Sequence, residues 1–410
     1  MTSTPPRRLR VLIASDAAWA SSGYAVQVKH LAPRLAQHCD LALLATYGLQ
    51  GSRIDWQGIP VYPGGLDPFG NDVIKDAALD WRADVVLTLK DTFVFQPDKL
   101  QGVRWCPLVP VDHDPITPQI SSVLRAAYRP IAYAPHGFRS LRTAGFDPLY
   151  APHAYDPALI SPQGQNDARN ALGMDPTLFI VGMVAVNRGG VPSRKAWPQN
   201  LEAFALFAKD KPDARLFLHT AIANPQEGGI DIPYYVNRFG IADKVFYCDQ
   251  QRYKVGFPDE YMNAFYNAID VLNAVSLGEG FGVPTLEAQA AGTPVIVGDW
   301  CAQEDLCFGG WKVPKEYALR FPDQQLNDVY VPTPQGVAQA MHGAYGALKT
   351  KAAQHRDAAI VGAAPYAIDR VVTEHWLPLL DELAAQIGRE AARGVLRIVR
   401  PEECGIEVAV

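Results

Sequence analysis

The sequence predicts an α/β protein made of two doubly wound, Rossmann-like parallel-sheet domains that face a cleft. Short apolar runs alternate with longer amphipathic segments along most of the 410 residues, a pattern typical of βαβ units and a parallel sheet. Prolines and glycines cluster between residues 156 and 176, and the alternation restarts behind them. A chain of 410 residues is long for one domain and has enough residues for two. We therefore expect a domain boundary at this cluster of prolines and glycines.

The apolar runs define the expected strands in chain order. In the front half we expect strands at 10–15, 41–47, 83–89, 105–111, 130–134 and 149–152. In the back half we expect strands at 179–186, 214–220, 244–248, 269–275 and 294–298. The amphipathic stretches 25–37 and 199–208 are expected helices between strands.

These elements divide into an N-terminal domain over residues 1–160 and a C-terminal domain over residues 161–365. Apolar residues at helical spacing between 366 and 390, among them Trp376 and Leu380, predict a helix that crosses back towards the first domain. The tail, residues 391–410, is mixed in charge, and we assign it no structure.

Charge and composition exclude several function classes. The net charge of −6 is split unevenly, because residues 1–155 carry 15 Lys and Arg against 13 Asp, a balance of +2. This argues against non-specific nucleic-acid binding and leaves open a weak preference of the front half for an anionic acceptor or for anionic lipid, as a weak peripheral membrane contact. No apolar run is long enough to span a bilayer, and we expect no transmembrane segment and a cytoplasmic location. The six cysteines form no CxxC pair, which argues against a zinc ribbon.

The most informative stretch of the chain runs from Gly278 to Glu287. It reads as a glycine-rich loop after a strand, followed by a helix that begins near Pro284, with Glu279 in the loop and Glu287 in the first turn. The first turn of a helix presents free N–H groups and positive charge, and it binds anions readily. Carboxylates are good acceptors for hydroxyl groups. Phosphate on the amides and hydroxyls on the acids together predict a sugar-nucleotide site.

A basic loop follows the expected strand at 179–186 and contains Arg188, Arg194 and Lys195. One interpretation is a clamp for a diphosphate, since these cations suit a leaving group that gains negative charge. The other is a solvated basic loop. The glycine loop later in the same domain favours the clamp.

Asp112, His113 and Asp114 end another apolar run. They fit a metal-binding DxD motif, a histidine that faces the cleft and contacts a reacting sugar, or a capped turn before Pro115. Because the basic loop already supplies positive charge, we prefer the histidine without a metal.

Gly23 lies in the loop after the first strand and either lets a ligand approach the backbone closely or forms a plain turn. This loop has no GxGxxG fingerprint, so we expect no NAD or FAD site.

The stretch from Glu279 to Glu287 resembles the E-x7-E motif of retaining glycosyltransferases with the GT-B fold, most closely glycosyltransferase family 4. Residues 290–296 resemble the A-x-G-x-P-V-I run of that family, and residues 151–156 resemble its domain-joining motif, with His153-Ala154 in place of Asn-Gly. The resemblance covers most of residues 10–390 and is strong from about 178 to 305.

The resemblance implies transfer of a sugar from a nucleotide-sugar donor to an unidentified acceptor, with retention at the anomeric carbon and with neither a cofactor nor an obligatory metal. It implies catalytic roles for His113, Arg188, Lys195 and Glu279. Glu279 would bind hydroxyls of the donor sugar, and Arg188 and Lys195 would stabilise the departing diphosphate. The interval between these cations is one residue longer than in the family, so Arg194 could share the role of Arg188.

The resemblance also implies a set of donor-binding residues. The amides near Phe281 would hold the diphosphate, Glu287 would bind the ribose hydroxyls, Gly23 would permit close approach, and the base would lie near residues 247–251. The set is Gly23, Tyr247, Gln250, Phe281, Gly282, Val283, Thr285 and Glu287.

Two other functions compete with sugar transfer. One is a nucleotide-sugar epimerase or a phosphorylase on the same fold, and the other is a non-catalytic module that binds a sugar nucleotide. The sequence does not identify the acceptor, which could be a glycan, a lipid, a protein, a small molecule or a modified nucleic acid.

Overall fold

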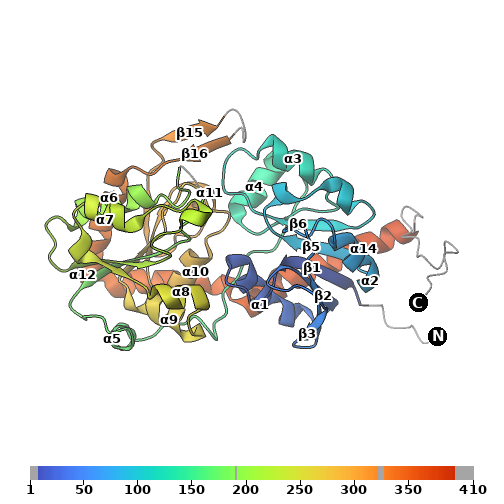
Figure 1. Cartoon of the computed structure of the whole chain (residues 1–410), viewed down its shortest axis with the longest axis horizontal. Helices are drawn as coiled ribbons and strands as arrows, with labels where there is room; N and C mark the ends of the chain where they lie inside the picture. Colours follow the sequence, from blue (N-terminus) through green and yellow to red (C-terminus); the bar gives the residue numbers. More distant parts are fainter. Residues whose placement is uncertain (1–7, 190–191, 322–326, 393–410) are drawn as a thin grey trace. The chain divides into compact units, whose positions relative to one another are not determined.

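A computed structural model describes residues 8–189, 192–321 and 327–392. Contacts between Cα atoms divide the chain into two compact units (Figure 1). Unit 1 comprises Met1–Leu108, Val123–Ile131 and Val372–Val410, and unit 2 comprises Val109–Ser122 and Ala132–Val371. Most of the predicted tail, residues 393–410, lies outside the described residues.

The first sheet has eight strands in the order β3-β4-β2-β1-β5-β6-β7-β8. These strands are β1 (Arg10–Asp16), β2 (Asp40–Tyr47), β3 (Ile54–Trp56), β4 (Ile59–Pro63), β5 (Val85–Leu89), β6 (Trp105–Val109), β7 (Ile131–Ala132) and β8 (Leu149–Tyr150). All six strands predicted in the front half are present. The sequence analysis missed β3 and β4, which pair antiparallel around a tight turn at Gln57 and Gly58, both with positive φ.

The second sheet has six strands in the order β11-β10-β9-β12-β13-β14, and every pair of neighbours is parallel. Its strands are β9 (Phe179–Val184), β10 (Ala214–His219), β11 (Val245–Tyr247), β12 (Val271–Asn273), β13 (Val295–Gly298) and β14 (Trp311–Val313). The five strands predicted in the back half are confirmed. The short β14 and the antiparallel hairpin of β15 (Ala318–Phe321) and β16 (Asn327–Tyr330) were not predicted.

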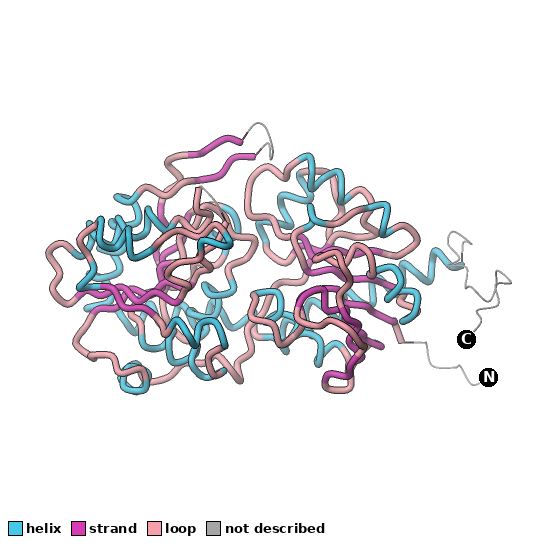
Figure 2. The backbone as a smooth tube through the Cα atoms, in the orientation of Figure 1, coloured by secondary structure: helices cyan, strands magenta, loops and turns pink. Residues whose placement is uncertain are grey.

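Helices flank the strands, as Figure 2 shows in cyan and magenta. They are α1 (Gly23–Leu35), α2 (Ile74–Trp81), α3 (Pro118–Leu124), α4 (Pro135–Thr143), α5 (Gln165–Ala171), α6 (Trp197–Ala208), α7 (Ile232–Arg238), α8 (Gln250–Val255), α9 (Asp259–Ala268), α10 (Val283–Ala290), α11 (Cys301–Asp305), α12 (Pro334–Ala363), α13 (Ile368–Val371) and α14 (Leu377–Ala392). The helices expected at 25–37 and 199–208 correspond to α1 and α6. No helix in the described ranges is both long and apolar enough to cross a membrane.

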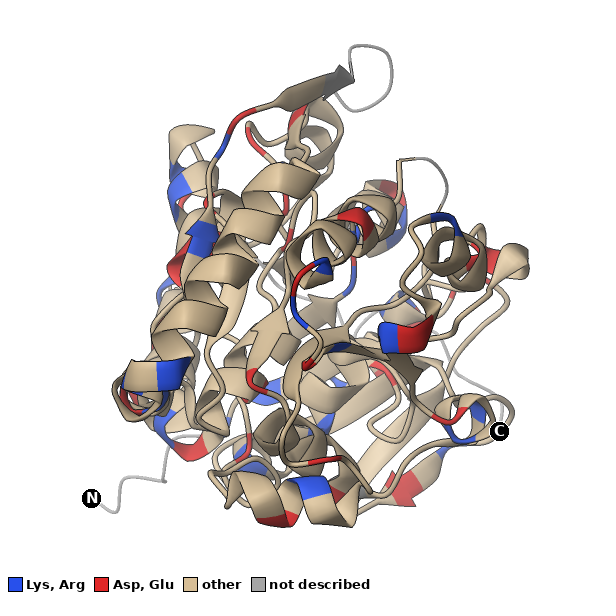
Figure 3. Cartoon of the chain, turned by 90° about the vertical axis from the view of Figure 1, so that its left-hand side faces the viewer, with Lys and Arg blue, Asp and Glu red and all other residues tan. Residues whose placement is uncertain are grey.

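Each unit has its own apolar core. In unit 2, Phe204 and Phe207 of α6 pack with Val181 of β9 and Met341 of α12. In unit 1, Leu12 and Val86 from neighbouring strands pack with Trp105. On the face shown in Figure 3, basic and acidic residues are interspersed along the ribbon rather than gathered by sign.

A buried ion pair joins α5 to the start of β12. The Arg169 guanidinium donates to the Asp270 carboxylate at 2.7 Å and to the carbonyl oxygens of Ala268 and Pro176, each at 2.8 Å. Burial raises the pKa of Asp270, although the charge of Arg169 opposes this shift. Removing Arg169 would therefore leave a buried carboxylate without its cation.

We expect Arg169→Met to lower the free energy of unfolding of the C-terminal region by about 3–5 kcal/mol, the usual cost of breaking a buried pair. Urea denaturation followed by far-UV circular dichroism measures this change. The matched control is Arg238→Met on α7, where the side chain is exposed and the effect should stay within about 0.5 kcal/mol. Equal stabilities of the two variants would contradict the structural role of Arg169.

Candidate functional site

A pocket opens at the carboxyl ends of β9 and β12, where the strand order of the second sheet reverses. Ligands in doubly wound sheets bind at such a reversal. Its cavity volume is about 20 Å³, and the rest of the hollow is open to solvent. Its lining comes from the ends of the two strands, the basic loop and the first turn of α10: Met183, Val184, Ala185, Lys195, Asn273, Ala274, Val275, Glu279, Gly282, Pro284 and Thr285.

Glycines shape the loop that leads into α10. Gly282 has a φ of +102° at the N-cap of the helix, a conformation that side chains strongly disfavour. A Cβ atom on Gly278 would lie 1.9 Å from the carbonyl oxygen of Asp112, so only glycine allows this approach of the two segments. The loop thereby brings Glu279 and the N–H groups of α10 to one pocket, as the sequence predicted from the strand–loop–helix pattern.

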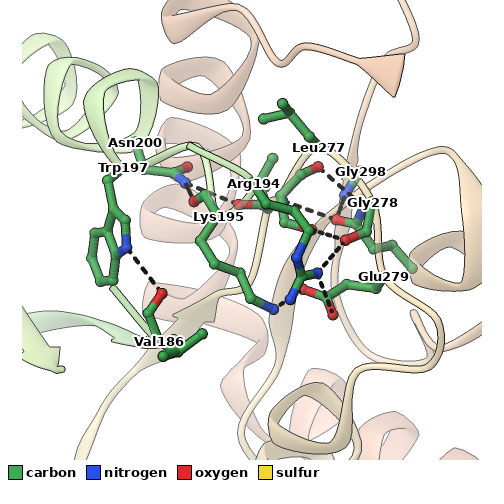
Figure 4. A network of polar contacts seen from close by, with 12 residues as sticks. Val186, Arg194, Lys195, Trp197, Asn200, Leu277, Gly278, Glu279 and Gly298 are labelled. Carbon is green, nitrogen blue, oxygen red and sulfur yellow. Dashed lines mark hydrogen bonds and ion pairs between the residues drawn. The ribbon is translucent and has the colours of Figure 1, made fainter. Parts of the chain in front are cut away.

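Glu279 is held by two cations of the basic loop (Figure 4). The Lys195 ammonium donates to Glu279 Oε1, and the Arg194 guanidinium lies 3.6 Å from Glu279 Oε2 and donates to the carbonyl oxygen of Gly278 at 2.9 Å. The side chains of Glu279 and Lys195 are only 14% and 17% exposed. Burial favours the neutral carboxyl, but Lys195 and Arg194 outweigh it and lower the pKa of Glu279. Glu279 is therefore an ionised carboxylate at neutral pH.

The basic loop is fixed by its backbone. Ala196, directly after Lys195, has a φ of +50°, and α6 begins at the next residue. Asn200 of α6 donates to the carbonyl oxygens of Lys195 at 3.1 Å and Val275 at 2.9 Å. The N–H group of Leu277 donates to the carbonyl oxygen of Arg194 at 2.8 Å. These bonds join the basic loop to the glycine loop, so both cations are positioned before a ligand arrives.

Burial also lowers the pKa of Lys195, and the neighbouring charge of Arg194 acts in the same direction, while Glu279 opposes both. A buried ammonium beside another cation is stabilised strongly by an additional anion. A diphosphate is such an anion, and Lys195 lines the pocket in which it would bind.

His113 is oriented by its neighbour in sequence. Its Nδ1 lies 2.8 Å from Asp112 Oδ1, and its Nε2 is buried without a hydrogen-bond partner in the described part of the chain. Burial alone would raise the pKa of Asp112, yet the hydrogen bond and charge of His113, together with Arg194, lower it to about 2. Asp112 therefore stays ionised and orients the ring, with Nε2 unpaired.

Glu287 is half-buried on α10. Burial raises the pKa of its carboxyl to about 7, and the hydroxyl of Tyr266, which donates to Glu287 Oε2 at 2.8 Å, only partly offsets that effect. No other hydrogen bond to this carboxylate is recorded among the described residues. Its remaining lone pairs can accept hydroxyl groups of a ligand.

The other predicted donor-binding residues lie in different surroundings, some in the pocket lining and some outside it. Thr285 and Gly282 line the pocket, Val283 begins α10, and Phe281 is buried against Tyr133 and His153. Tyr247 is half-buried at the end of β11.

Three further predicted residues lie outside the lining of this pocket. Gln250 uses its side chain to hold the adjacent loop, with bonds to the backbone of Thr220 and Ile222. Arg188 is exposed, whereas Arg194 and Lys195 contact Glu279, and the role of Arg188 at a diphosphate stays a prediction. Gly23 belongs to unit 1, whereas the other predicted site residues belong to unit 2.

Sequence reasoning missed Asn200 and Tyr266. Both lie inside helices rather than in the loops that carry the motifs. Asn200 is fully buried on the apolar face of an amphipathic helix, and a polar residue at such a position is the signal that could have identified it.

Parts of the chain are similar in sequence to known proteins. Residues 179–323 match the family model described as Glycosyl transferases group 1. A D-inositol 3-phosphate glycosyltransferase from Mycolicibacterium gilvum is 33% identical over 146 residues, which cover 34% of this chain and 29% of that protein. The lipopolysaccharide core biosynthesis mannosyltransferase LpsB from Rhizobium meliloti is 27% identical over 150 residues, which cover 36% of this chain and 39% of that protein. These matches span less than half the length of either relative.

Solved structures resemble the chain over nearly its full length. Sucrose-phosphate synthase from Thermosynechococcus elongatus superposes with a TM-score of 0.65 at 18% identity, covering 94% of this chain and 99% of that one. Anabaena HepE in complex with UDP-glucose also gives a TM-score of 0.65, at 15% identity, covering 91% of this chain and 99% of that one. Residues 179–323 thus match the Glycosyl transferases group 1 family model, and the described part of the chain has the GT-B fold of two doubly wound parallel-sheet domains.

Proposed function

We propose that the protein is a glycosyltransferase that moves a sugar from a nucleotide-sugar donor to an acceptor, with retention of the anomeric configuration and without an obligatory metal. The observation that carries the proposal is the Lys195–Glu279–Arg194 cluster beside the N-terminus of α10. It joins cations and helix N–H groups for a diphosphate to a carboxylate for sugar hydroxyls in a single pocket.

The diphosphate would bind to the first turn of α10. Its oxygens would accept from the free N–H groups there and compete with Glu279 for Lys195 and Arg194. Glu279 would then accept hydrogen bonds from hydroxyls of the donor sugar, and His113 would contact the same sugar through Nε2.

Departure of the nucleoside diphosphate builds negative charge where these groups already lie. Preorganised charges of this kind stabilise the transition state more than the ground state, which accelerates the reaction. Because two side-chain cations and a helix N-terminus neutralise the leaving group, the proposal includes no metal. Retention is inferred from the resemblance of residues 279–287 to the E-x7-E motif.

Glu287 would bind the ribose. Burial raises the pKa of its carboxyl to about 7, and ribose hydroxyls would replace the hydration that burial removes. Among donors, UDP-sugars are the first choice for testing, since Anabaena HepE was solved with UDP-glucose.

A donor screen tests this function. We expect one class of UDP-, GDP- or ADP-sugar, at about 100 times its dissociation constant, to raise the melting temperature by on the order of 5–10 °C. With that donor, free nucleoside diphosphate should accumulate, also in the presence of EDTA. An isomerised donor or a sugar phosphate as product would indicate an epimerase or a phosphorylase instead. Binding without turnover across an acceptor panel would indicate a non-catalytic module.

A further inference from the structure

Glu279 lies on the loop between β12 and α10, outside any strand or helix. A carboxylate on a loop acts in catalysis only if the backbone holds it in one place, because small displacements of a reacting group are costly. One side of this loop is held from α6 and the basic loop (Figure 4). There the N–H group of Leu277 donates to the carbonyl oxygen of Arg194, and Asn200 donates to that of Val275. Different residues, which follow β13, hold the opposite side.

A buried amide side chain on α11 makes the principal contacts on that opposite side. Gln303 is 2% exposed, and its Oε1 atom accepts from the N–H group of Ser276 at 3.1 Å. Its Nε2 atom donates to the carbonyl oxygen of Ser276, also at 3.1 Å. Oε1 accepts a further bond at 3.1 Å from the N–H group of Gly298, the last residue of β13. The side chain thus bonds to Ser276 as the peptide group of a neighbouring strand would, beyond the end of β12.

Two more groups from the segment after β13 bond to the same loop. The indole N–H of Trp300 donates to the carbonyl oxygens of Ser276 and Leu277, each at 3.1 Å. The N–H group of Ala302 donates to the carbonyl oxygen of Glu279 at 3.3 Å. The backbone that carries the carboxylate is therefore bonded directly to the segment that carries Gln303.

The chemistry of this contact requires an amide. Ser276 presents both an N–H group and a carbonyl oxygen, so the partner must accept through one atom and donate through another. A carboxylate of the same length accepts equally well but places negative charge against the carbonyl oxygen. Ser276 also extends the contact towards Glu279, since its hydroxyl donates to the carbonyl oxygen of Gly278 at 3.1 Å.

We propose that Gln303 is a positioning residue for sugar transfer, and that its amide holds Ser276 and the following glycine loop so that Glu279 meets the donor sugar. The proposal rests on the proposed function and adds a residue to that same site. Gln303 does not line the pocket, so it acts through the loop and not on the substrate. Its loss should lower the rate of transfer more than the affinity for the nucleoside diphosphate, which lacks the sugar that Glu279 would bind.

The variant Gln303→Glu tests this role through pH. A protonated carboxyl keeps one donor and one acceptor and can replace the amide, whereas the ionised form cannot donate to the carbonyl oxygen of Ser276. The rate constant of the variant is divided by that of the native protein at each pH. We expect this ratio to fall by about 10–100-fold between pH 5 and pH 8.5, as a small displacement of Glu279 would cause. The dissociation constant of the nucleoside diphosphate should change far less.

Asn267 on α9 provides the matched control. It is fully buried, and its amide accepts from the N–H group of Gln163 at 2.7 Å and donates to the carbonyl oxygen of Ser161 at 3.0 Å. Asn267→Asp therefore makes the same change from amide to acid at a segment that carries no predicted site residue. It should lower the melting temperature at alkaline pH, as Gln303→Glu does, and leave the ratio of rate constants independent of pH.

Hydrogen–deuterium exchange tests the proposal without turnover. At pH 8.5 the backbone amides of residues 276–279 should exchange faster in Gln303→Glu than in the native protein, and Asn267→Asp should leave them unchanged. Trp300→Phe is the second variant if Gln303→Glu unfolds at this pH. It removes the indole donor and keeps an aromatic ring, so it should speed the same exchange and lower the rate of transfer by about 2–10-fold.

Three results overturn the proposal. They are a ratio of rate constants that does not depend on pH in folded Gln303→Glu, the same pH dependence in Asn267→Asp, or unchanged exchange of residues 276–279 in the folded variants. Failure of the proposed function is a separate result, namely that the native protein releases no nucleoside diphosphate from any sugar nucleotide. In that case the exchange measurement still decides whether Gln303 holds the loop.

Discussion

Replacing Lys195 by methionine is expected to lower the rate constant of sugar transfer by about 10²–10³-fold, the usual effect of removing one group that stabilises charge in the transition state. Lys195 lines the pocket, and Glu279 holds its ammonium beside the first turn of α10. Methionine keeps most of the side-chain volume, so the loop should keep its backbone bonds. The rate is measured from nucleoside diphosphate released at saturating donor.

The matched control for this variant is Lys209→Met. Lys209 lies at the other end of α6 with an exposed side chain, and its replacement should leave transfer unchanged. Lys195→Met also removes the cation nearest to Glu279. We therefore expect the pKa of Glu279 to rise in this variant. Transfer by the Lys195 variant should consequently depend more steeply on pH than transfer by the native protein. Native-like transfer by Lys195→Met would remove this residue from the mechanism.

Replacing Glu287 by glutamine is expected to stabilise the fold at alkaline pH and to weaken binding of the nucleotide. The pKa of this carboxyl is raised from 4.5 to about 7 by burial, so the folded state disfavours the ionised form. The native protein therefore has its full stability below the unfolded pKa and loses stability as the pH rises towards the folded pKa. At pH 8 the penalty is at most about 3 kcal/mol, and glutamine, which cannot ionise, does not incur it.

The measurement is urea denaturation of both proteins at pH 4 and pH 8. The advantage of Glu287→Gln over the native protein should be larger at pH 8, because only the native carboxyl ionises between the two values. In titration calorimetry the same variant should bind the nucleoside diphosphate more weakly by about 1–3 kcal/mol, since one acceptor for ribose hydroxyls is lost. Glu260→Gln, at an exposed site on α9, should change neither quantity. An equal stability difference at the two pH values would show that Glu287 is not held in an environment that disfavours its charge.

Much of the fold was readable because its strands are buried on both faces. Runs such as Val11–Leu12–Ile13 and Phe179–Val184 are continuously apolar, as strands of a covered parallel sheet must be. The strands that were missed are short and less apolar. In β3, Ile54 and Asp55 are exposed, and three residues are too few to show a period. A tight turn at Gln57 and Gly58 defines this hairpin, and its sequence differs from the common Asn-Gly signal.

The site was readable where its chemistry lies in a contiguous motif. Glu279, Lys195 and the N-terminus of α10 meet in one pocket, as the spacing of the glycine loop suggested. Which arginine of the basic loop lies near Glu279 was harder to predict from the sequence. Arg188 and Arg194 lie in the same loop, and the structure brings Arg194 to Glu279, with the carbonyl oxygen of Arg194 bonded to the N–H group of Leu277 in the glycine loop.

Other properties of the site depend on contacts between distant segments. Burial raises the pKa of Glu287, and the hydroxyl of Tyr266, which lies 21 residues earlier in the chain, partly offsets this rise. In unit 1, the ion pair of Asp16 and Lys90 likewise joins residues 74 positions apart, and nothing in either local sequence indicates it. Such pairings follow from sheet order, because parallel neighbours are brought together by long crossover connections.

The most direct test of the central claim is the release of nucleoside diphosphate from a sugar nucleotide in the presence of EDTA, with the anomeric configuration of the product followed by NMR. The account predicts that the native protein releases the diphosphate and forms a glycoside with the configuration of the donor, and that Glu279→Gln and Lys195→Met each lose most of this activity while remaining folded. Full activity in both variants, or a product of inverted configuration, would contradict it.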